Sequence, residues 1–191
     1  HIHFNGAGGN LGAGKYNDGS RENRMILAEK LADGMRRAWE ATEKTPLSAK
    51  DISWRIEPTS IPTAPWLSLE TLEKAMVEQE NPARILGTAT RLAWMQRCAA
   101  GHKIDITCLA LGKARVVHMP GELFVEYQLG AKAARPDLFV TMAAYGDYAT
   151  GYIGTTKAYD EGGYETGQDA SNVAPETEAV LMAAIKKLLQ E

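Results

Sequence analysis

The sequence has little cysteine: its 191 residues include only two, Cys98 and Cys108. The pair lacks the CxxC spacing typical of metal and redox motifs. Cys98 falls in a helical pattern, whereas Cys108 falls in an apolar strand pattern. Because an unpaired cysteine packs as a small apolar side chain, we interpret both as buried free thiols. A single disulfide is the alternative if the protein is exported.

Long apolar runs and an excess of positive charge are also missing. No run is long enough to span a bilayer, and no signal-peptide pattern is present. The net charge of -3 and the pI near 5.9 argue against a nucleic-acid-binding protein, which needs clustered Lys and Arg. The chain begins at His1 and not at Met, so we expect a processed chain or a fragment.

The hydrophobic pattern predicts one domain of mixed α/β type spanning residues 1–191, without internal repeats. Ser20 is expected to cap an amphipathic helix that ends near Thr42. Its apolar stripe comprises Met25, Ala28, Ala32, Met35 and Trp39. Further helices are expected from residue 68 onward and at 82–100, 121–134 and 175–189. Strands are expected at 1–4, 51–57, 104–111, 114–118 and 138–144. The Gly- and Tyr-rich segment 145–167 is expected to be irregular.

A glycine-rich segment, Gly9 to Lys15, matches the first seven positions of a phosphate-binding P-loop. Tyr16 occupies the eighth position, where Mg²⁺ binding needs a Ser or Thr hydroxyl. The turn signal Asn17-Asp18-Gly19 then bends the chain where a helix should begin. We interpret the segment as a tight loop that can border an active site, and a nucleotide site is the alternative.

Histidines suggest metal binding at one place. His1 and His3 would lie on the same face of a strand, because side chains alternate along it. The competing interpretation is an exposed strand edge. His102 and His118 have no partner at ligand spacing, and we expect His118 to lie at a strand end.

The most informative segment is Pro120-Gly121-Glu122, followed at a distance by Tyr159. A carboxylate entering a helix after a tight turn and a phenol from a later polar loop can converge on one hard cation. Glu126 lies four residues after Glu122 and would share its helix face, so the two carboxylates can divide acid and base roles. The competing interpretation is one acid stabilised by the helix dipole and one solvated acid.

Several motifs follow these residues in a fixed order. They are Val116-Val117-His118-Met119-Pro120-Gly121-Glu122, Leu138-Phe139-Val140-Thr141-Met142-Ala143-Ala144, Thr150-Gly151-Tyr152-Ile153, Thr155-Thr156-Lys157-Ala158-Tyr159, Tyr164-Glu165 and Ala170-Ser171. In order and spacing this series resembles the neutral/alkaline (non-lysosomal) ceramidase family, over about a third of the chain. Members of that family are zinc-dependent amidases that split ceramide into sphingosine and a fatty acid.

The resemblance implies an α/β fold with a mixed sheet flanked by helices, forming the C-terminal part of a larger ceramidase-like catalytic domain. It implies that Glu122 and Tyr159 are zinc ligands, and that Zn²⁺ activates a water and polarises the scissile carbonyl. Asp147, Tyr148 and Tyr152 would shape the pocket for a small-molecule or lipid substrate. The histidine ligands would come from an N-terminal segment missing here, and the location would be secreted or periplasmic.

Two departures from the family pattern widen the range of substrates that we expect. Asn10 and Gly12 stand where the family's Gly-Asp-Val-Ser-Pro-Asn motif has its aspartate and its serine. The segment after Ser171 lacks the tyrosine expected to steady the amide oxyanion. We therefore expect a hydrolase of an amide or ester bond whose substrate need not be ceramide. The alternatives are a non-catalytic binding or assembly subunit and a nucleotide-dependent enzyme.

Overall fold

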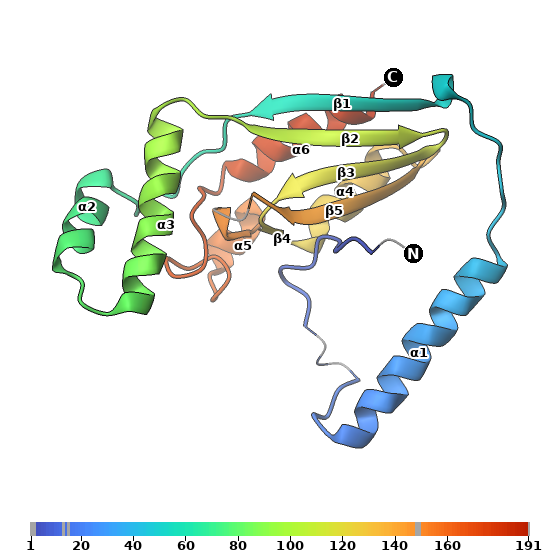
Figure 1. The fold of residues 1–191 in the computed structure, drawn as a ribbon, viewed down its shortest axis with the longest axis horizontal. Helices are drawn as coiled ribbons and strands as arrows, with labels where there is room; N and C mark the ends of the chain where they lie inside the picture. Colours follow the sequence, from blue (N-terminus) through green and yellow to red (C-terminus); the bar gives the residue numbers. More distant parts are fainter. Residues whose placement is uncertain (1–2, 13, 15, 148–149, 191) are drawn as a thin grey trace.

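The computed structural model describes residues 3–12, 14, 16–147 and 150–190, and Figure 1 shows their arrangement. The helices are α1 (Arg21–Glu40), α2 (Leu69–Glu78), α3 (Pro82–Ala99), α4 (Val125–Ala134), α5 (Thr156–Glu161) and α6 (Thr177–Leu189), with a short 3-10 turn η1 (Ala49–Asp51). The strands are β1 (Ile52–Thr59), β2 (Ile104–Leu111), β3 (Ala114–Pro120), β4 (Glu122–Leu123), β5 (Phe139–Gly146) and β6 (Tyr152–Ile153).

A four-stranded sheet in the order β1-β2-β3-β5 forms the centre of the fold. The first three strands pair antiparallel, and β3 pairs with β5 in parallel. A parallel pair needs a crossover, and α4 supplies it between β3 and β5. The expected mixed α/β sheet flanked by helices is therefore confirmed. Among the described residues, no helix is long and apolar enough to cross a membrane.

The hydrophobic core lies between this sheet and helices α4 and α6. Alternate residues of the strands point toward the helices, as the period of two requires. The fully buried side chains of this core include Ile106, Val117, Met142, Leu181 and Ile185. Thus one face of the sheet is covered by helices packed along it (Figure 1).

The starts of α1, α2 and α3 were predictable because their caps are local. The Ser20 side chain accepts from the backbone N–H of Asn23, and Ser68 accepts from that of Thr71. Asn81 caps α3, with a proline at the next position. The hairpin between β2 and β3 turns at Gly112, whose φ is 57°.

Three predicted segments were wrong in part. The helix expected over 121–134 begins only at Val125, because Glu122 and Leu123 form a strand with the distant pair Tyr152 and Ile153. The segment 145–167 is not wholly irregular, since it contains β6 and α5. Of the strand expected at 1–4, His1 and Ile2 lie outside the described residues, and His3 and Phe4 belong to no strand.

Both cysteines are free. Cys108 is buried on β2, and Cys98 is half-buried on α3. Burial raises the pKa of each thiol above its ordinary value. The interpretation as two free thiols is confirmed, although Cys98 retains partial exposure.

Candidate active site

The turn at Gly121 positions the candidate site. Its φ is 61°, and a Cβ atom there would lie 2.2 Å from Thr150 Oγ1 and 2.6 Å from the Gly151 carbonyl oxygen. Only glycine accepts this conformation and this close approach without strain. The chain therefore leaves β3, turns at Gly121 and enters β4 directly against the segment at Thr150 and Gly151.

Glu122 lies on β4 and is half-buried. Its backbone N–H donates to the Gly151 carbonyl oxygen at 3.0 Å, and the residue pairs with Tyr152 of β6. The acid in the first turn of α4 is Glu126. The expected helix-dipole stabilisation of Glu122, and a helix face shared with Glu126, are therefore wrong. The position of Glu122 is fixed by strand pairing instead.

The glycine-rich N-terminal loop packs against this strand. The Gly9 backbone N–H donates to the Leu123 carbonyl oxygen at 2.8 Å, and a Cβ at Gly9 would lie 2.6 Å from the Glu122 carbonyl oxygen. Asn10 Oδ1 accepts from the backbone N–H of Val125 at 2.9 Å, so it caps α4. Asn10 Nδ2 donates to Glu126 at 2.9 Å. The loop thus borders Glu122, and its residue Gly9 packs against the backbone of Glu122 and Leu123.

Tyr159 lies on α5, a helix that the sequence pattern did not predict. Thr155 accepts from the backbone N–H of Ala158, and Glu178 of α6 accepts from that of Thr156 at 2.6 Å. These two side chains satisfy the first turn of a six-residue helix and link it to α6. The position of the Tyr159 phenol is therefore fixed by a helix that contacts α6, and not by a flexible loop.

The Tyr159 hydroxyl is 2.7 Å from Ser171 Oγ. Ser171 is fully buried, and its Oγ donates to the Tyr152 carbonyl oxygen at 2.9 Å. Burial raises the pKa of Tyr159, and the Ser171 hydrogen bond lowers it by a smaller amount. The phenol is consequently neutral near pH 7. Through Ser171, it is anchored to Tyr152, the residue paired with Glu122.

The expected substrate-binding residues are placed separately. Asp147 has a φ of 40° and lines a cavity of about 280 Å³ with Phe4 and His118. Tyr152 lines another cavity, of about 260 Å³, with Arg91. Tyr148 lies outside the described residues. Asp147 and Tyr152 therefore line different cavities.

None of the described histidines lies in a metal-binding group. His3 Nε2 is 3.0 Å from Asn5 Oδ1, and His118 Nδ1 is 3.1 Å from Thr107 Oγ1. His102 contacts Arg97. His1 lies outside the described residues. Across the described ranges, no group of three or more His, Cys, Asp or Glu side chains could hold a metal ion.

Sequence reasoning missed three contributors to this region. Ser171 holds the phenol, and the Ala170-Ser171 motif was the signal that marked it. Asn10 caps α4 from 115 residues away, and no local pattern indicates this contact. Thr150 Oγ1 is buried against Gly121 and has no hydrogen-bond partner among the described residues. A buried hydroxyl without a partner is costly.

Comparisons with known proteins bear on the fold. No family model and no curated protein matches the sequence. Among solved structures, the chain is similar to a neutral ceramidase from Pseudomonas aeruginosa, with a TM-score of 0.52 and 15% identity over 94% of this chain. A ceramidase complexed with C2 gives a TM-score of 0.49 and 16% identity over 87% of this chain.

The match to the Pseudomonas enzyme shows a ceramidase-like fold at an identity too low to show more. This chain spans about a third of the length of that enzyme, 34%. The fold implied by the sequence resemblance is thus confirmed as part of a ceramidase-like structure.

Proposed function

We propose that this chain forms part of a zinc-dependent hydrolase that cleaves an amide or ester bond, with Glu122 and Tyr159 among the zinc ligands. The single observation that carries the proposal is the connection between these two residues. Glu122 pairs with Tyr152, and the Tyr152 carbonyl accepts from the serine that holds Tyr159. Two residues that carry oxygen donors and lie far apart in sequence are thereby linked to one backbone segment.

The donor chemistry fits zinc. A carboxylate is a common zinc ligand, and a phenol becomes a ligand once a nearby cation favours its ionised form. When bound, zinc would supply a Lewis acid that polarises the scissile carbonyl and activates water. Two donors leave at least one protein ligand to be provided. An N-terminal segment outside this chain would provide it, as histidines, in keeping with the resemblance.

The hydrogen bonds of Ser171 would change when Tyr159 loses its proton. In the neutral state, Ser171 Oγ donates its only proton to the Tyr152 carbonyl, so the phenol donates to Ser171. If Tyr159 ionises, its oxygen can only accept, and the serine proton must turn toward it. The Tyr152 carbonyl then loses its side-chain donor. Ligand binding at Tyr159 would in this way be coupled to β6 and its partner Glu122.

The substrate would be a lipid or small molecule with an amide or ester bond, and ceramide is one candidate. Tyr152 packs edge-on against Tyr164, with ring centroids 6.0 Å apart, and the pair offers apolar surface with hydroxyl tips. Asp147, which lines a different cavity, and Tyr148, which lies outside the described residues, belong to the same proposed set of substrate-binding residues. A role in sphingolipid metabolism outside the cytoplasm, secreted or periplasmic, belongs to the same proposal.

Zinc stoichiometry tests the ligand assignment directly. We expect Glu122→Gln and Tyr159→Phe each to lower the zinc content, measured by elemental analysis of the longest expressed form of the protein. The matched control is Glu126→Gln, which removes a neighbouring carboxylate that binds Asn10. Unchanged zinc in Glu122→Gln, with a folded protein by circular dichroism, would remove Glu122 from the ligand set.

A non-catalytic binding or assembly subunit is the second candidate, favoured by the extent of uncovered apolar surface. Ile52, Trp54 and Phe139 of the central sheet are each about half exposed or more, at 48%, 51% and 70%. A zinc-free protein that is folded and hydrolyses neither amide nor ester substrates would support this candidate.

A further inference from the structure

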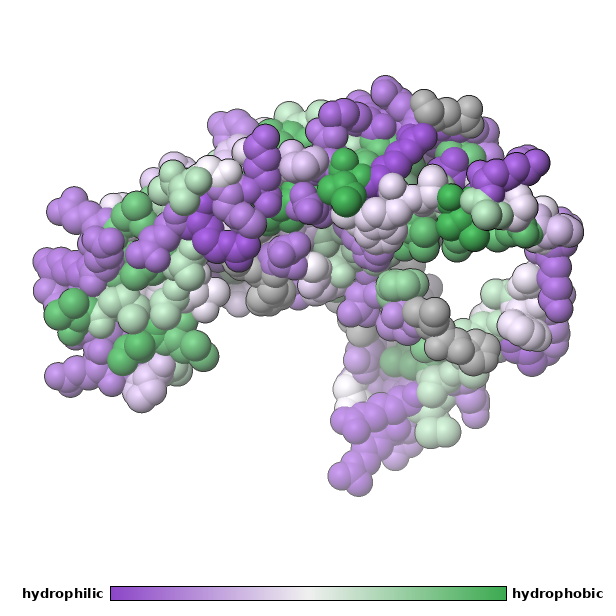
Figure 2. Space-filling view, turned by 45° about the horizontal axis from the view of Figure 1, so that its top comes forward, coloured by the Kyte–Doolittle hydropathy of each residue, from purple (hydrophilic) through white to green (hydrophobic). Residues whose placement is uncertain are grey.

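Helix α3 is attached to the segment that follows α5 by two side chains one turn apart. Arg91 Nη2 donates to the Asp169 carbonyl oxygen at 2.9 Å, and Trp94 Nε1 donates to the Asn172 carbonyl oxygen at 3.2 Å. Residues three apart share a helix face, so one face of α3 is held against this segment. Figure 1 shows α3 beside it, and Figure 2 shows the same end of the molecule as a lobe with mixed hydrophilic and hydrophobic groups.

A cavity of about 260 Å³ lies at this junction. Its lining includes Gly87 and Arg91 of α3, Tyr152 of β6, and Tyr164 and Asp169 of the later segment. A Cβ atom at Gly87 would meet no atom within 4 Å. Because Arg91 follows four residues later on the same helix face, the missing side chain at Gly87 leaves room beside the guanidinium.

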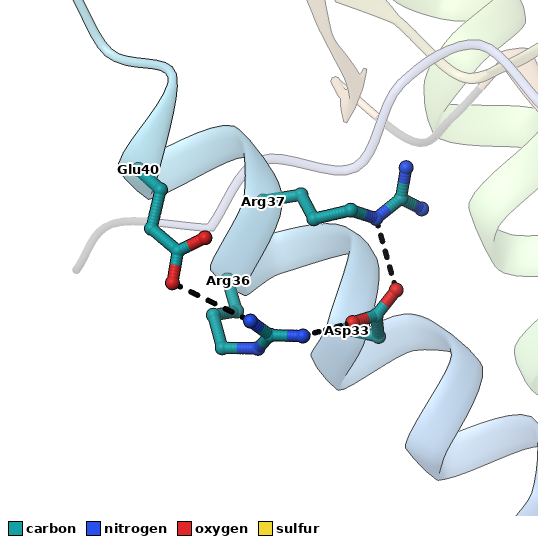
Figure 3. A network of polar contacts seen from close by, with 4 residues as sticks. All are labelled: Asp33, Arg36, Arg37 and Glu40. Atoms are coloured by element: carbon teal, nitrogen blue, oxygen red, sulfur yellow. Dashed lines mark hydrogen bonds and ion pairs between the residues drawn. The ribbon is translucent and has the colours of Figure 1, made fainter.

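Arg91 brings a positive charge into the cavity wall without a paired negative charge. The residue is half-buried, and within the described part of the chain no carboxylate forms an ion pair with it. Helix α1 shows the usual arrangement instead: Figure 3 shows Arg36 bound to both Asp33 and Glu40. A guanidinium has five N–H donors, and one nitrogen of Arg91 is used by the Asp169 carbonyl. The planar fork of the remaining donors suits a carboxylate.

Two tyrosines form another part of the wall. The rings of Tyr152 and Tyr164 pack edge-on, with centroids 6.0 Å apart and an interplanar angle of 73°. Tyr164 is 69% exposed, so this wall opens to solvent. Phenol rings offer apolar surface with a polar tip. The cavity therefore suits a ligand that combines a carboxylate with a short carbon chain.

The cavity also borders the strand that contains Glu122. Tyr152 is the strand partner of Glu122, and neighbouring strands lie about 5 Å apart. Gly151, another lining residue, accepts from the Glu122 backbone N–H at 3.0 Å. A ligand in the cavity thus contacts the two residues that hold the backbone of Glu122.

We propose that this cavity binds a carboxylate that the substrate carries beside its scissile bond. The inference rests on the hydrolase function proposed above and names the substrate class: acyl derivatives of an amino acid or a hydroxy acid. On hydrolysis the acyl C–N or C–O bond breaks, the hydroxyl of water joins the acyl carbon, and a proton goes to the leaving nitrogen or oxygen. Arg91 holds the carboxylate of the leaving part. Ceramide carries no ionised group and would leave Arg91 without an anionic partner.

Binding without zinc tests this inference by itself. The longest expressed form of the protein is kept in EDTA, and the probes are N-hexanoylglycine and its uncharged amide, which differ only at the carboxylate. We expect isothermal titration calorimetry to show the anion binding about tenfold more tightly. Arg91→Ala should abolish this preference. The matched control is Arg84→Ala, which removes an exposed arginine from the first turn of the same helix and should keep the preference.

Two variants that retain Arg91 cover the case in which Arg91→Ala fails to fold. Asp169→Asn removes a negative charge from the cavity wall and keeps the carbonyl that accepts from Arg91, so the preference for the anion should increase. Gly87→Leu should fill the cavity and weaken the binding of both probes. Equal binding of the two probes by the wild type, or a preference that persists in Arg91→Ala, would overturn the inference. Hexanoate that binds as tightly as N-hexanoylglycine would also overturn it, since the cavity would then take the released acid.

The zinc measurements separate this inference from the proposed function. If zinc content depends on Glu122 but neither probe is preferred, only the substrate class is wrong. If zinc content is unchanged in Glu122→Gln while the preference depends on Arg91, the carboxylate site stands and the zinc-ligand assignment of Glu122 is wrong.

Discussion

The Tyr159 hydroxyl and Ser171 Oγ lie 2.7 Å apart, which joins α5 to the segment that follows it. Ser171 also donates to the Tyr152 carbonyl, so the phenol is tied to the strand that pairs with Glu122. Five predictions test how this part of the molecule is held.

Removing Ser171 should change the ionisation of Tyr159. The serine hydrogen bond lowers the pKa of Tyr159 while burial raises it, so Ser171→Ala should raise that pKa further. The lost hydrogen bond should also reduce the free energy of unfolding by about 1 kcal/mol. Alkaline titration by ultraviolet absorbance, with Tyr159→Phe subtracted, measures the pKa. A lower pKa in Ser171→Ala would contradict the assignment.

The raised pKa of Tyr159 also predicts the sign of its effect on stability. A neutral phenol is favoured in the folded protein, so its contribution is complete below the ordinary tyrosine pKa, about 10. It is lost as the pH rises through the higher folded value. Urea unfolding of the wild type and Tyr159→Phe across this range should show the wild type losing stability faster.

Gly121→Ala should destabilise the protein by more than about 1 kcal/mol. The residue has a φ of 61°, and the new methyl group would lie 2.2 Å from Thr150 Oγ1. The matched control is Gly87→Ala in α3, where no atom lies within 4 Å of the added group. Because alanine favours helix, the control should be neutral or stabilising. Equal urea midpoints for the two variants would show that the turn is not constrained.

Asn10→Ala should free the N-terminal loop from α4. The side chain caps the helix at Val125 and bonds Glu126, so its loss should cost about 1 kcal/mol. Asn10→Asp keeps the acceptor for Val125 and loses the donor to Glu126. Its free energy of unfolding should lie between those of the wild type and Asn10→Ala. Hydrogen exchange at the Gly9 amide, which donates to Leu123, should accelerate in Asn10→Ala. Unchanged exchange there would mean that the glycine contact holds the loop by itself.

Glu178→Gln should weaken α5 and displace Tyr159. The carboxylate accepts from the backbone N–H of Thr156 at 2.6 Å, and a charged acceptor at a helix start is stronger than a neutral one. We expect a loss of about 1 kcal/mol in the free energy of unfolding. Glu176→Gln, an exposed acid two residues earlier, is the control and should change stability little. A similar loss in both variants would argue against a specific cap.

Much of the fold was predictable because its signals are local. Ser20 and Asn81 cap helices within three residues of themselves, and Gly112 turns the hairpin between β2 and β3. The apolar run of β5 indicated a strand that packs in the core, and Val140 and Met142 are buried there. For the candidate site, the motifs identified the residues Glu122 and Tyr159 but not their local structure. Neither the strand that contains Glu122 nor the helix that contains Tyr159 was predicted.

The sequence by itself determined where the longer helices and the four strands of the central sheet lie, which residues alternate toward a core, and that Gly121 must turn. These follow from backbone sterics and side-chain period, which act over a few residues. Only the tertiary structure decided that Glu122 joins a strand with Tyr152, that Ser171 holds Tyr159, and that one apolar sheet face stays open. Such contacts join residues far apart in the chain, and an apolar pattern requires cover without specifying which segment supplies it.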